Sequence, residues 1–266
     1  MFKKITIKDI QKKKDENEKI SMLTAYDFST AKYIDEAGID IILVGDSVAM
    51  VVLGYDTTCS IGIEEMKIFT GAVARGAKHS LIVADMPFLS CETDINSAVL
   101  NAGALIRSGA NAVKIEGCSE HILSVVQRLV ETGIPVMGHV GFTPQSFNQL
   151  GGYKIQGKTK EAAKAILEQA KKLEKAGAFS VVLEMVPEDC AKIVTENLTI
   201  PTIGIGAGRY CSGQVLVSDD IFGKYSEMNP KFVRKYGDMK SFITDCAKKY
   251  NEDVKNKSFP NEEEIF

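Results

Sequence analysis

The chain alternates between short, almost wholly apolar runs and longer stretches with the apolar period of an amphipathic helix. The run from Ile41 to Val44 is typical, with four aliphatic residues in a row, three of them β-branched. Such a run is expected for a strand that is buried on both faces. Runs of this kind predict strands at residues 20–25, 39–46, 80–87, 111–117, 135–141, 179–186, 201–208 and 214–220.

The stretches between most of these runs predict helices. The clearest covers residues 159–178, where Ile166, Ala170 and Leu173 share one face and Lys and Glu residues occupy the other. Glycine precedes several of the strands, where the end of a helix favours the left-handed conformation. These glycines are Gly38, Gly109, Gly133 and Gly177.

Eight strands that alternate with helices favour an α/β fold of the (β/α)8 TIM barrel type over a doubly wound open sheet, which is the alternative. We expect a single domain over residues 1–266, with the barrel at about 20–220. A short N-terminal helix within residues 1–19 is expected to close one end of the barrel, and residues 221–266 are expected to form a helical C-terminal tail. The loop 142–158 is long and rich in glycine, and such loops often carry binding residues.

Ionisable side chains stand where the predicted strands end. They are Asp46, Asp85, Lys114, Glu116, His139 and Glu184. In a parallel barrel these ends lie on one face, and that face carries the active site. Grouped carboxylates repel one another and resist desolvation, and a divalent cation removes this cost. Oxygen ligands suit Mg²⁺, so the pattern predicts a magnesium site.

Asp46, Asp85 and Glu116 come from three adjacent strands and are the candidate Mg²⁺ ligands. Glu184 comes from the far side of the ring and is the candidate general base. The simpler alternative for each is structural, because a lone Asp at the end of a strand is commonly a helix N-cap or a turn residue.

Two further candidates have simpler alternatives as well. Lys114 and Glu116 are two residues apart on one strand and point to the same face, so they can form an ion pair. We expect His139 to be a core histidine or one that contacts a metal ligand. The stretch GIGAG at 204–208 is similar to a phosphate-binding loop, and its alternative is close backbone packing.

Charge and cysteine content exclude several classes of function. The formal net charge is 32 − 35 = −3, which argues against a nucleic-acid-binding protein or a polybasic membrane patch. No apolar run approaches the length of a membrane span, and the charged residues 12–18 lack the apolar segment of a signal peptide. The six cysteines form no CxxC pair, so we expect free thiols in the cytoplasm and no structural zinc.

Several longer motifs resemble one enzyme family. They begin with MLTAYDFSTAKYIDEAGIDIILVGDSVAMVVLGYDTT and continue in order with ADMPF, AVKIEG, GHVGFTPQS, GGYKIQGK, VLEMVP, PTIGIGAG and GQVLVSDD. These motifs extend over essentially the whole chain. In this order they resemble the 3-methyl-2-oxobutanoate hydroxymethyltransferase family, also called the ketopantoate hydroxymethyltransferases.

The resemblance implies a TIM-barrel enzyme of pantothenate biosynthesis. Such an enzyme transfers a hydroxymethyl unit from the co-substrate 5,10-methylenetetrahydrofolate to 3-methyl-2-oxobutanoate, which gives 2-dehydropantoate through Mg²⁺-assisted enolisation. It also implies a homo-oligomer, often a decamer, that acts on small molecules.

The same resemblance implies a role for individual residues. By motif match, Asp46, Asp85 and Glu116 would hold Mg²⁺, and Glu184 would accept the proton. Contacts to the keto acid would come from Asp46, Ser47, Asp85 and Lys114. The chain departs from the common family pattern at residues 59–62, at Phe142 in place of Leu and at Ser212 in place of Asp. None of these positions is a proposed ligand or base.

Two rival functions are weighed against this one. A Mg²⁺-dependent carbon–carbon lyase or mutase of the phosphoenolpyruvate mutase and isocitrate lyase type has similar carboxylates at its strand ends. The chain lacks the KxCG-type catalytic loop of those enzymes, which argues against that rival. A non-catalytic scaffold that binds folate or keto acid is expected to have lost the base, whereas Glu184 is present.

Overall fold

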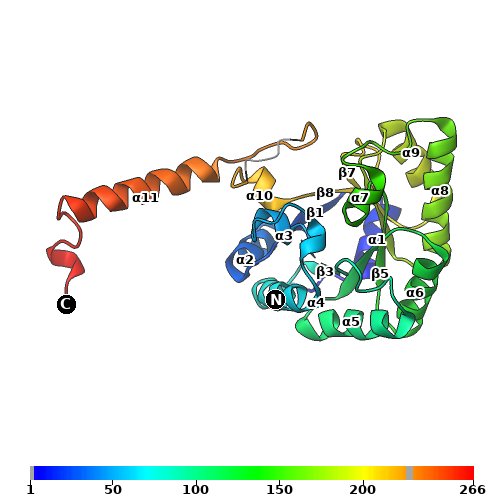
Figure 1. The fold of residues 1–266 in the computed structure, drawn as a ribbon, viewed down its shortest axis with the longest axis horizontal. Helices are drawn as coiled ribbons and strands as arrows, with labels where there is room; N and C mark the ends of the chain where they lie inside the picture. The colour runs from blue at the N-terminus through cyan, green and yellow to red at the C-terminus, as the bar shows by residue number, and fades with distance from the viewer. Residues whose placement is uncertain (1–2, 226–229) are drawn as a thin grey trace. The chain divides into compact units, whose positions relative to one another are not determined.

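A computed structural model of the chain describes residues 3–225 and 230–266. Eight parallel strands form a closed barrel in sequence order, in which β8 pairs with β1 (Figure 1). The strands are β1 Ile20–Thr24, β2 Ile41–Val44, β3 Leu81–Asp85, β4 Ala112–Glu116, β5 Val136–Gly141, β6 Ser180–Glu184, β7 Thr202–Ile205 and β8 Gly213–Leu216. The prediction of a (β/α)8 TIM barrel is confirmed, and the doubly wound open sheet is excluded.

Helices follow most of the strands. Within residues 1–217 the helices are α1 Ile7–Asp15, α2 Phe28–Glu36, α3 Val48–Val51, α4 Ile63–Gly76, α5 Ile95–Ser108, α6 Glu120–Glu131, α7 Phe147–Leu150, α8 Lys160–Lys175 and α9 Glu188–Asn197. The 3₁₀ turns are η1 Thr58–Ser60 and η2 Pro144–Ser146. The connection from β7 to β8, residues 206–212, contains no helix. The long loop after β5 contains two short elements, η2 and α7.

The observed strands are shorter than the predicted ones, and one predicted boundary is wrong. The stretch 214–220 is predicted to be strand throughout, but β8 ends at Leu216 and the helical turn α10, Ser218–Ile221, begins two residues later. Asp219 and Asp220 lie in the first turn of α10, where acidic side chains favour a helix N-terminus.

Helix α8 illustrates how the amphipathic pattern builds the outer layer. Thr159 caps its N-terminus by accepting a hydrogen bond from the Ala162 amide, and Ile166, Ala170 and Leu173 are its buried residues. These three are the residues that the sequence pattern assigned to one face. Leu173 reaches β5 at Gly138, where a Cβ would lie 2.8 Å from Leu173 Cδ1. Only glycine allows this helix to pack so closely on the strand.

The short helix predicted within residues 1–19 is α1, and it packs on the barrel core. Thr6 and Asp9 form a capping box at its start. Ile10 is fully buried in the hydrophobic cluster that fills the barrel, together with Ile20 and Met22. Lys14 Nζ donates to the carbonyls of Leu198 and Ile200, each at 2.7 Å. This helix therefore closes the barrel at the end opposite the strand C-termini.

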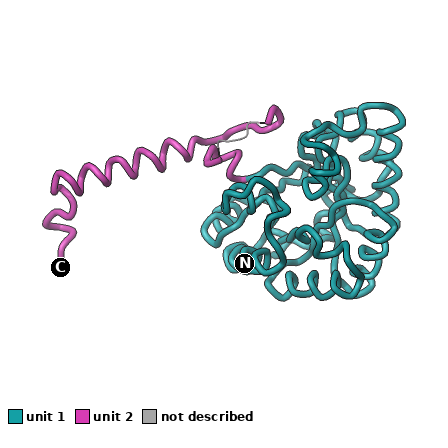
Figure 2. The backbone as a smooth tube through the Cα atoms, viewed as in Figure 1, with its two compact units in different colours: residues 1–217 teal, residues 218–266 magenta. Residues whose placement is uncertain are grey.

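The chain divides into two compact units, residues 1–217 and 218–266 (Figure 2). The prediction of a single domain over residues 1–266 stays a prediction. Among the described residues, every helix is too short or too polar to serve as a membrane span.

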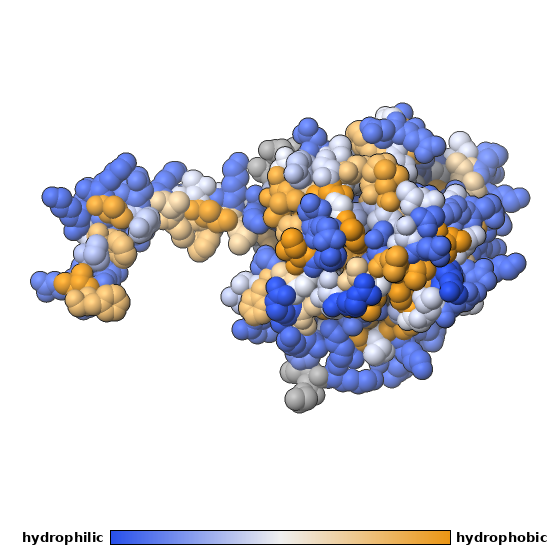
Figure 3. Space-filling model, turned by 60° about the horizontal axis from the view of Figure 1, so that its bottom comes forward, coloured by the Kyte–Doolittle hydropathy of each residue, from blue (hydrophilic) through white to orange (hydrophobic). Residues whose placement is uncertain are grey.

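The second unit contains α10, α11 Met239–Lys255 and the 3₁₀ turn η3 Glu262–Glu264. Helix α11 has no buried residue. Even its large aromatic side chains are exposed, Phe242 to 68% and Tyr250 to 59%. Apolar side chains lie among hydrophilic ones along this helix (Figure 3). An apolar face left open in this way is typical of a contact surface.

Asp35 of α2 ties that helix to the chain just before β3. It is 5% exposed and accepts hydrogen bonds from the amides of Lys78 and Ser80 at 2.8 and 2.7 Å. Burial alone would raise the pKa of Asp35, but the hydrogen bonds from Ser80, Lys78 and His79 lower it to about 2. The charged form is therefore the one that stabilises the fold.

Asp35→Asn is expected to lower the free energy of unfolding by about 2 kcal/mol at neutral pH. Because the folded-state pKa is depressed, the stabilisation is complete above about pH 4 and is lost as the pH falls toward 2. Urea denaturation across this range measures the effect. Glu36→Gln, at an exposed neighbour paired with Lys32 at 3.9 Å, is the control and should change stability by less than about 0.5 kcal/mol. An equal loss of unfolding free energy in both variants would contradict the stabilising role of the Asp35 carboxylate.

Candidate active site

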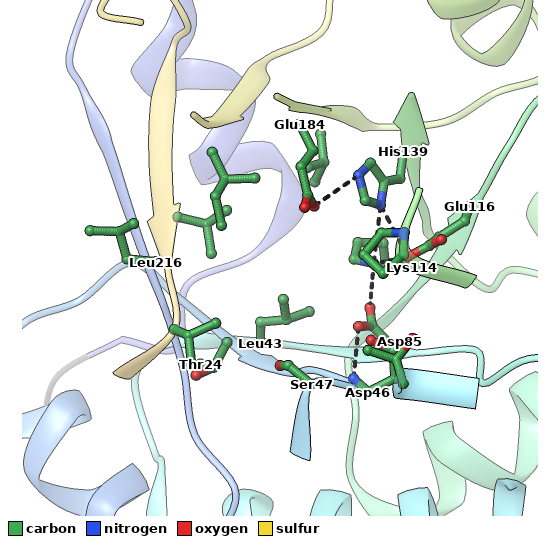
Figure 4. Close-up of a pocket in the computed structure, with 16 residues that line it drawn as sticks. Thr24, Leu43, Asp46, Ser47, Asp85, Lys114, Glu116, His139, Glu184 and Leu216 are labelled. Atoms are coloured by element: carbon green, nitrogen blue, oxygen red, sulfur yellow. Dashed lines mark hydrogen bonds and ion pairs between the residues drawn. The ribbon is translucent and has the colours of Figure 1, made fainter. Parts of the chain in front are cut away.

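A small cavity of about 110 Å³ lies at the C-terminal ends of the barrel strands (Figure 4). All of the candidate residues line it: Asp46, Ser47, Asp85, Lys114, Glu116, His139 and Glu184. The parallel register explains this convergence, since Asp85 is level with Lys114 and Glu116 is level with His139 on neighbouring strands. The structure thus brings together every side chain that the sequence placed at a strand end.

Lys114 is a buried cation between carboxylates. Its Nζ lies 2.9 Å from Asp85 Oδ1 and 3.7 Å from Glu116 Oε1, and the residue is 5% exposed. Burial alone would lower the pKa of Lys114, but the charges of Asp85 and Glu116 raise it above its ordinary value. The ion pair with Glu116, proposed from the spacing of two, is therefore present along with a closer pair to Asp85.

The carboxylates crowd one another in spite of this lysine. The Asp46 amide donates to Asp85 Oδ2 at 3.0 Å. Burial, followed by the charges of Asp85 and Glu116, raises the pKa of Asp46 well above its ordinary value. Lys114 therefore does not fully offset the negative charge around Asp46, and a further cation would stabilise the ionised form.

His139 joins the acidic group to the candidate base. Its Nδ1 lies 3.4 Å from Glu116 Oε1, and its Nε2 lies 3.3 Å from Glu184 Oε2 (Figure 4). Burial and Lys114 oppose protonation, but the Glu116 and Glu184 carboxylates outweigh them and raise the pKa of His139 to about 9. The histidine contacts one candidate metal ligand, as expected, and it also lies within ion-pair distance of the Glu184 carboxylate.

The opposite wall of the cavity is apolar. Its residues are Leu43, Val182, Ile205, Val215, Leu216 and Val217. In Figure 4 the acids and Lys114 lie on one side, Leu43 and Leu216 lie on the other, and the Glu184 carboxyl group points into the space between them. Val182 and Glu184 share a face of β6, so the base stands at the boundary between the two halves.

Gln145 is a site residue that the sequence did not suggest. Its side-chain Nε2 donates to Asp46 Oδ2 at 2.8 Å and to the Met86 carbonyl at 2.9 Å. Its main-chain amide donates to Glu116 Oε2 at 3.0 Å. It lies in the long loop after β5, and the length of that loop was the only feature of the sequence that pointed to a binding residue there.

The chemistry of these groups fits a divalent cation. Asp85 Oδ1 and Glu116 Oε1 are buried, and their nearest described partners are basic groups: Lys114 Nζ lies 2.9 Å from the first and His139 Nδ1 lies 3.4 Å from the second. Within residues 3–225 and 230–266, no three His, Cys, Asp or Glu side chains are placed so that they could hold a metal ion together. One or two carboxylates, with waters or substrate oxygens completing the shell, are the usual arrangement for Mg²⁺ in proteins.

Comparison with known proteins identifies the family. A family model described as Ketopantoate hydroxymethyltransferase matches residues 4–262. The chain belongs to the ketopantoate hydroxymethyltransferase family. A relative from Caldicellulosiruptor bescii, named 3-methyl-2-oxobutanoate hydroxymethyltransferase, is 50% identical over 99% of each chain. Another of that name, from Thermosipho melanesiensis, is 55% identical over 94% of each chain. The chain is therefore a hydroxymethyltransferase enzyme, and a non-catalytic scaffold is excluded.

Two solved structures of other enzymes have a similar fold. Phosphonopyruvate hydrolase in complex with oxalate and Mg²⁺ has a TM-score of 0.63, with 10% identity over 98% of this chain and 93% of that one. A 2,3-dimethylmalate lyase of the PEP mutase/isocitrate lyase superfamily has a TM-score of 0.61, with 15% identity over 98% and 92% of the two chains. At this identity the likeness shows the fold alone. The rival lyase or mutase function is not favoured for a member of the ketopantoate hydroxymethyltransferase family.

The departures from the family pattern lie beside the cavity or away from it. Cys59 Sγ lies 3.6 Å from the carbonyl of Gln145, and its neighbour Thr58 lines the cavity. Phe142 is fully buried, with its ring centroid 5.2 Å from that of Tyr153. Ser212 exchanges two hydrogen bonds of 3.2 Å with Thr202. The serine therefore has a structural role between β7 and the start of β8.

The glycine stretch 204–208 packs closely against the protein itself. A Cβ on Gly208 would lie 2.6 Å from Glu188, which pairs with Arg209 at 3.0 Å. A carboxylate in this position repels a phosphate group. The close-packing alternative therefore describes Gly208, and a phosphate-binding role for this stretch stays a prediction.

Proposed function

We propose that the chain transfers a one-carbon unit from 5,10-methylenetetrahydrofolate to 3-methyl-2-oxobutanoate, which gives 2-dehydropantoate for pantothenate biosynthesis. Relatives that are 50–55% identical are named for this keto acid. The observation that carries the proposal is the division of the cavity. A charged half suits the 2-oxo carboxylate, an apolar half suits the two methyl groups, and Glu184 stands between them.

We further propose that Asp46, Asp85 and Glu116 hold Mg²⁺. One solved structure of similar fold is a complex with oxalate and Mg²⁺, and oxalate is a small dicarboxylate. Held by these residues, Mg²⁺ would supply polarisation of the ketone oxygen, which would acidify the hydrogen on C3. The crowding of three carboxylates in one cavity, where burial and the charges of Asp85 and Glu116 raise the pKa of Asp46, supports this role.

The protein's own groups then have separate tasks. Lys114 and Ser47 bind and orient the keto acid, and Lys114 stabilises negative charge as it develops on the substrate oxygen. Glu184 removes the C3 proton, held in position by His139 at 3.3 Å. The C3 carbanion equivalent forms the new bond to the methylene carbon of the folate as one of its two carbon–nitrogen bonds breaks and that nitrogen takes up a proton. Water then replaces the second nitrogen at this carbon, which releases tetrahydrofolate and the hydroxymethyl product. The apolar half keeps water from C3 until the donor arrives.

Exchange of the C3 hydrogen tests this proposal directly. In D₂O with Mg²⁺ and no folate, 3-methyl-2-oxobutanoate is expected to lose its C3 proton signal by NMR. The exchange should stop when the metal is removed with a chelator, and it should be absent in Glu184→Gln. If no exchange occurs with metal, either alone or with tetrahydrofolate added, the enolisation step is wrong.

We also propose that the enzyme is a cytoplasmic homo-oligomer, with a decamer as the expected size. All six cysteines are free thiols, as suits a reducing compartment. Helix α11 exposes apolar residues and buries none, which suits contact with further copies of the chain. Sedimentation equilibrium gives the mass, and a monomer at micromolar concentration would contradict the oligomer.

A further inference from the structure

Gln145 contacts the ends of three strands at once. Asp46 follows β2, Met86 follows β3 and Glu116 ends β4, and the glutamine donates one hydrogen bond to each of these residues. All three proposed metal ligands belong to these strand ends. No other residue described in the structure donates hydrogen bonds to both Asp46 and Glu116.

The orientation of the Gln145 amide is fixed by its partners. Asp46 Oδ2 and the Met86 carbonyl oxygen both accept hydrogen bonds and donate none, so the NH₂ group must face them. The bond to the carboxylate is charge-assisted and therefore stronger than one between neutral groups. Both hydrogens of the amide are thereby used in holding the end of β2 against the end of β3.

The loop that carries Gln145 is itself held in place. The Ser146 amide donates to the Thr143 carbonyl at 2.9 Å, and Pro144 fixes the backbone between them. The Gln145 carbonyl lies 3.6 Å from Cys59 Sγ of η1. The side-chain amide of Gln145 therefore extends from a turn whose backbone is fixed by these contacts.

The hydrogen bonds of Gln145 divide the carboxylate oxygens into two sets. Glu116 Oε2 accepts from the Gln145 main chain, and Gln145 makes no bond to Oε1 of that group. Asp46 Oδ2 accepts from the Gln145 side chain, and Gln145 makes no bond to Oδ1 of the same group. Glu116 Oε1 instead lies 3.4 Å from His139 Nδ1 and 3.7 Å from Lys114 Nζ. In each acid Gln145 therefore holds one oxygen and leaves the other to different partners.

We propose that Gln145 is a positioning residue of the cation site: it anchors one oxygen of Asp46 and one of Glu116, and so presents the other oxygen of each to a divalent cation. This inference rests on the proposed magnesium site. Partners that orient metal ligands in this way typically contribute about 10–100-fold to metal affinity.

The test is cation binding by the apoenzyme, measured without substrate. Gln145→Met keeps the volume and the main-chain amide but removes the side-chain donors, so it should weaken Mn²⁺ binding about 10–100-fold in electron paramagnetic resonance titrations. Mg²⁺ binding by calorimetry should weaken by a similar factor. Gln145→Ala, which cannot crowd the turn, should give the same loss. Gln149→Met, at an exposed side chain of α7 that makes no hydrogen bond to a described residue, is the matched control and should bind as the wild type does.

Activity separates positioning from general damage. In Gln145→Met the Mg²⁺ concentration needed for half-maximal activity should rise with the loss of affinity, while kcat recovers at saturating Mg²⁺. A purely structural role would lower kcat at every Mg²⁺ concentration. Equal or tighter Mn²⁺ binding in Gln145→Met, with the wild type binding normally, would overturn the role of Gln145 alone. No Mn²⁺ binding by the wild type would overturn the magnesium site and this inference together.

Discussion

Glu184→Gln is expected to lower turnover by about 10²–10⁴-fold, the usual contribution of a positioned general base. Gln has nearly the same shape as Glu and can still contact His139, which lies 3.3 Å from the carboxylate. The acids and Lys114 on the other strands are unchanged. Binding of the keto acid, measured by calorimetry with Mg²⁺ present, should therefore stay within a few-fold of the wild-type value while the chemistry is lost.

Glu188→Gln is the matched control for this variant. Glu188 lies at the start of α9, only four residues along the chain, and pairs with Arg209 outside the cavity. Its loss should leave both turnover and keto-acid binding near the wild-type values. Turnover within about tenfold of wild type in Glu184→Gln would remove Glu184 as the base, and some other cavity group would have to accept the C3 proton.

The barrel could be predicted because its strands are buried on both faces. β2 and β3 are buried at every position, so each appears in the sequence as an unbroken apolar run. The end of β8 was placed too late because an apolar run does not show whether the next residues extend a strand or begin a helix. Val217 is followed at once by the turn α10, in which Ser218 and Asp219 are buried. Side-chain contacts decide that boundary, and a local pattern does not contain them.

The same contrast holds for the site. Lys114 and Glu116 are two residues apart on β4 and both face the cavity, as do Val182 and Glu184 on β6, so strand parity places all four. Gln145 could not be placed in this way, because it lies in an irregular turn with no period. The bridge that His139 makes between Glu116 and Glu184 was also hidden, since it depends on distances across three strands.

Asp85→Asn is expected to weaken Mg²⁺ binding by at least about tenfold, since it removes one of the three proposed ligand charges. Asp85 is 2% exposed and holds Lys114 at 2.9 Å, so the variant also leaves the lysine with its longer contact to Glu116 at 3.7 Å. Breaking a buried pair from one side typically costs about 3–5 kcal/mol of stability. Two separate losses are therefore expected, one in metal affinity by calorimetry and one in unfolding free energy without metal.

Asp35→Asn separates these two losses. It also removes a buried carboxylate that is hydrogen-bonded to the start of β3, but from the N-terminal side of the strand, away from the cavity. Its unfolding free energy should fall while its Mg²⁺ affinity stays at the wild-type value. If both variants lose affinity in proportion to their stability, the loss in Asp85→Asn reflects a weakened fold. If Asp85→Asn binds Mg²⁺ as tightly as the wild type, the ion lies elsewhere and Asp85 serves only to pair with Lys114.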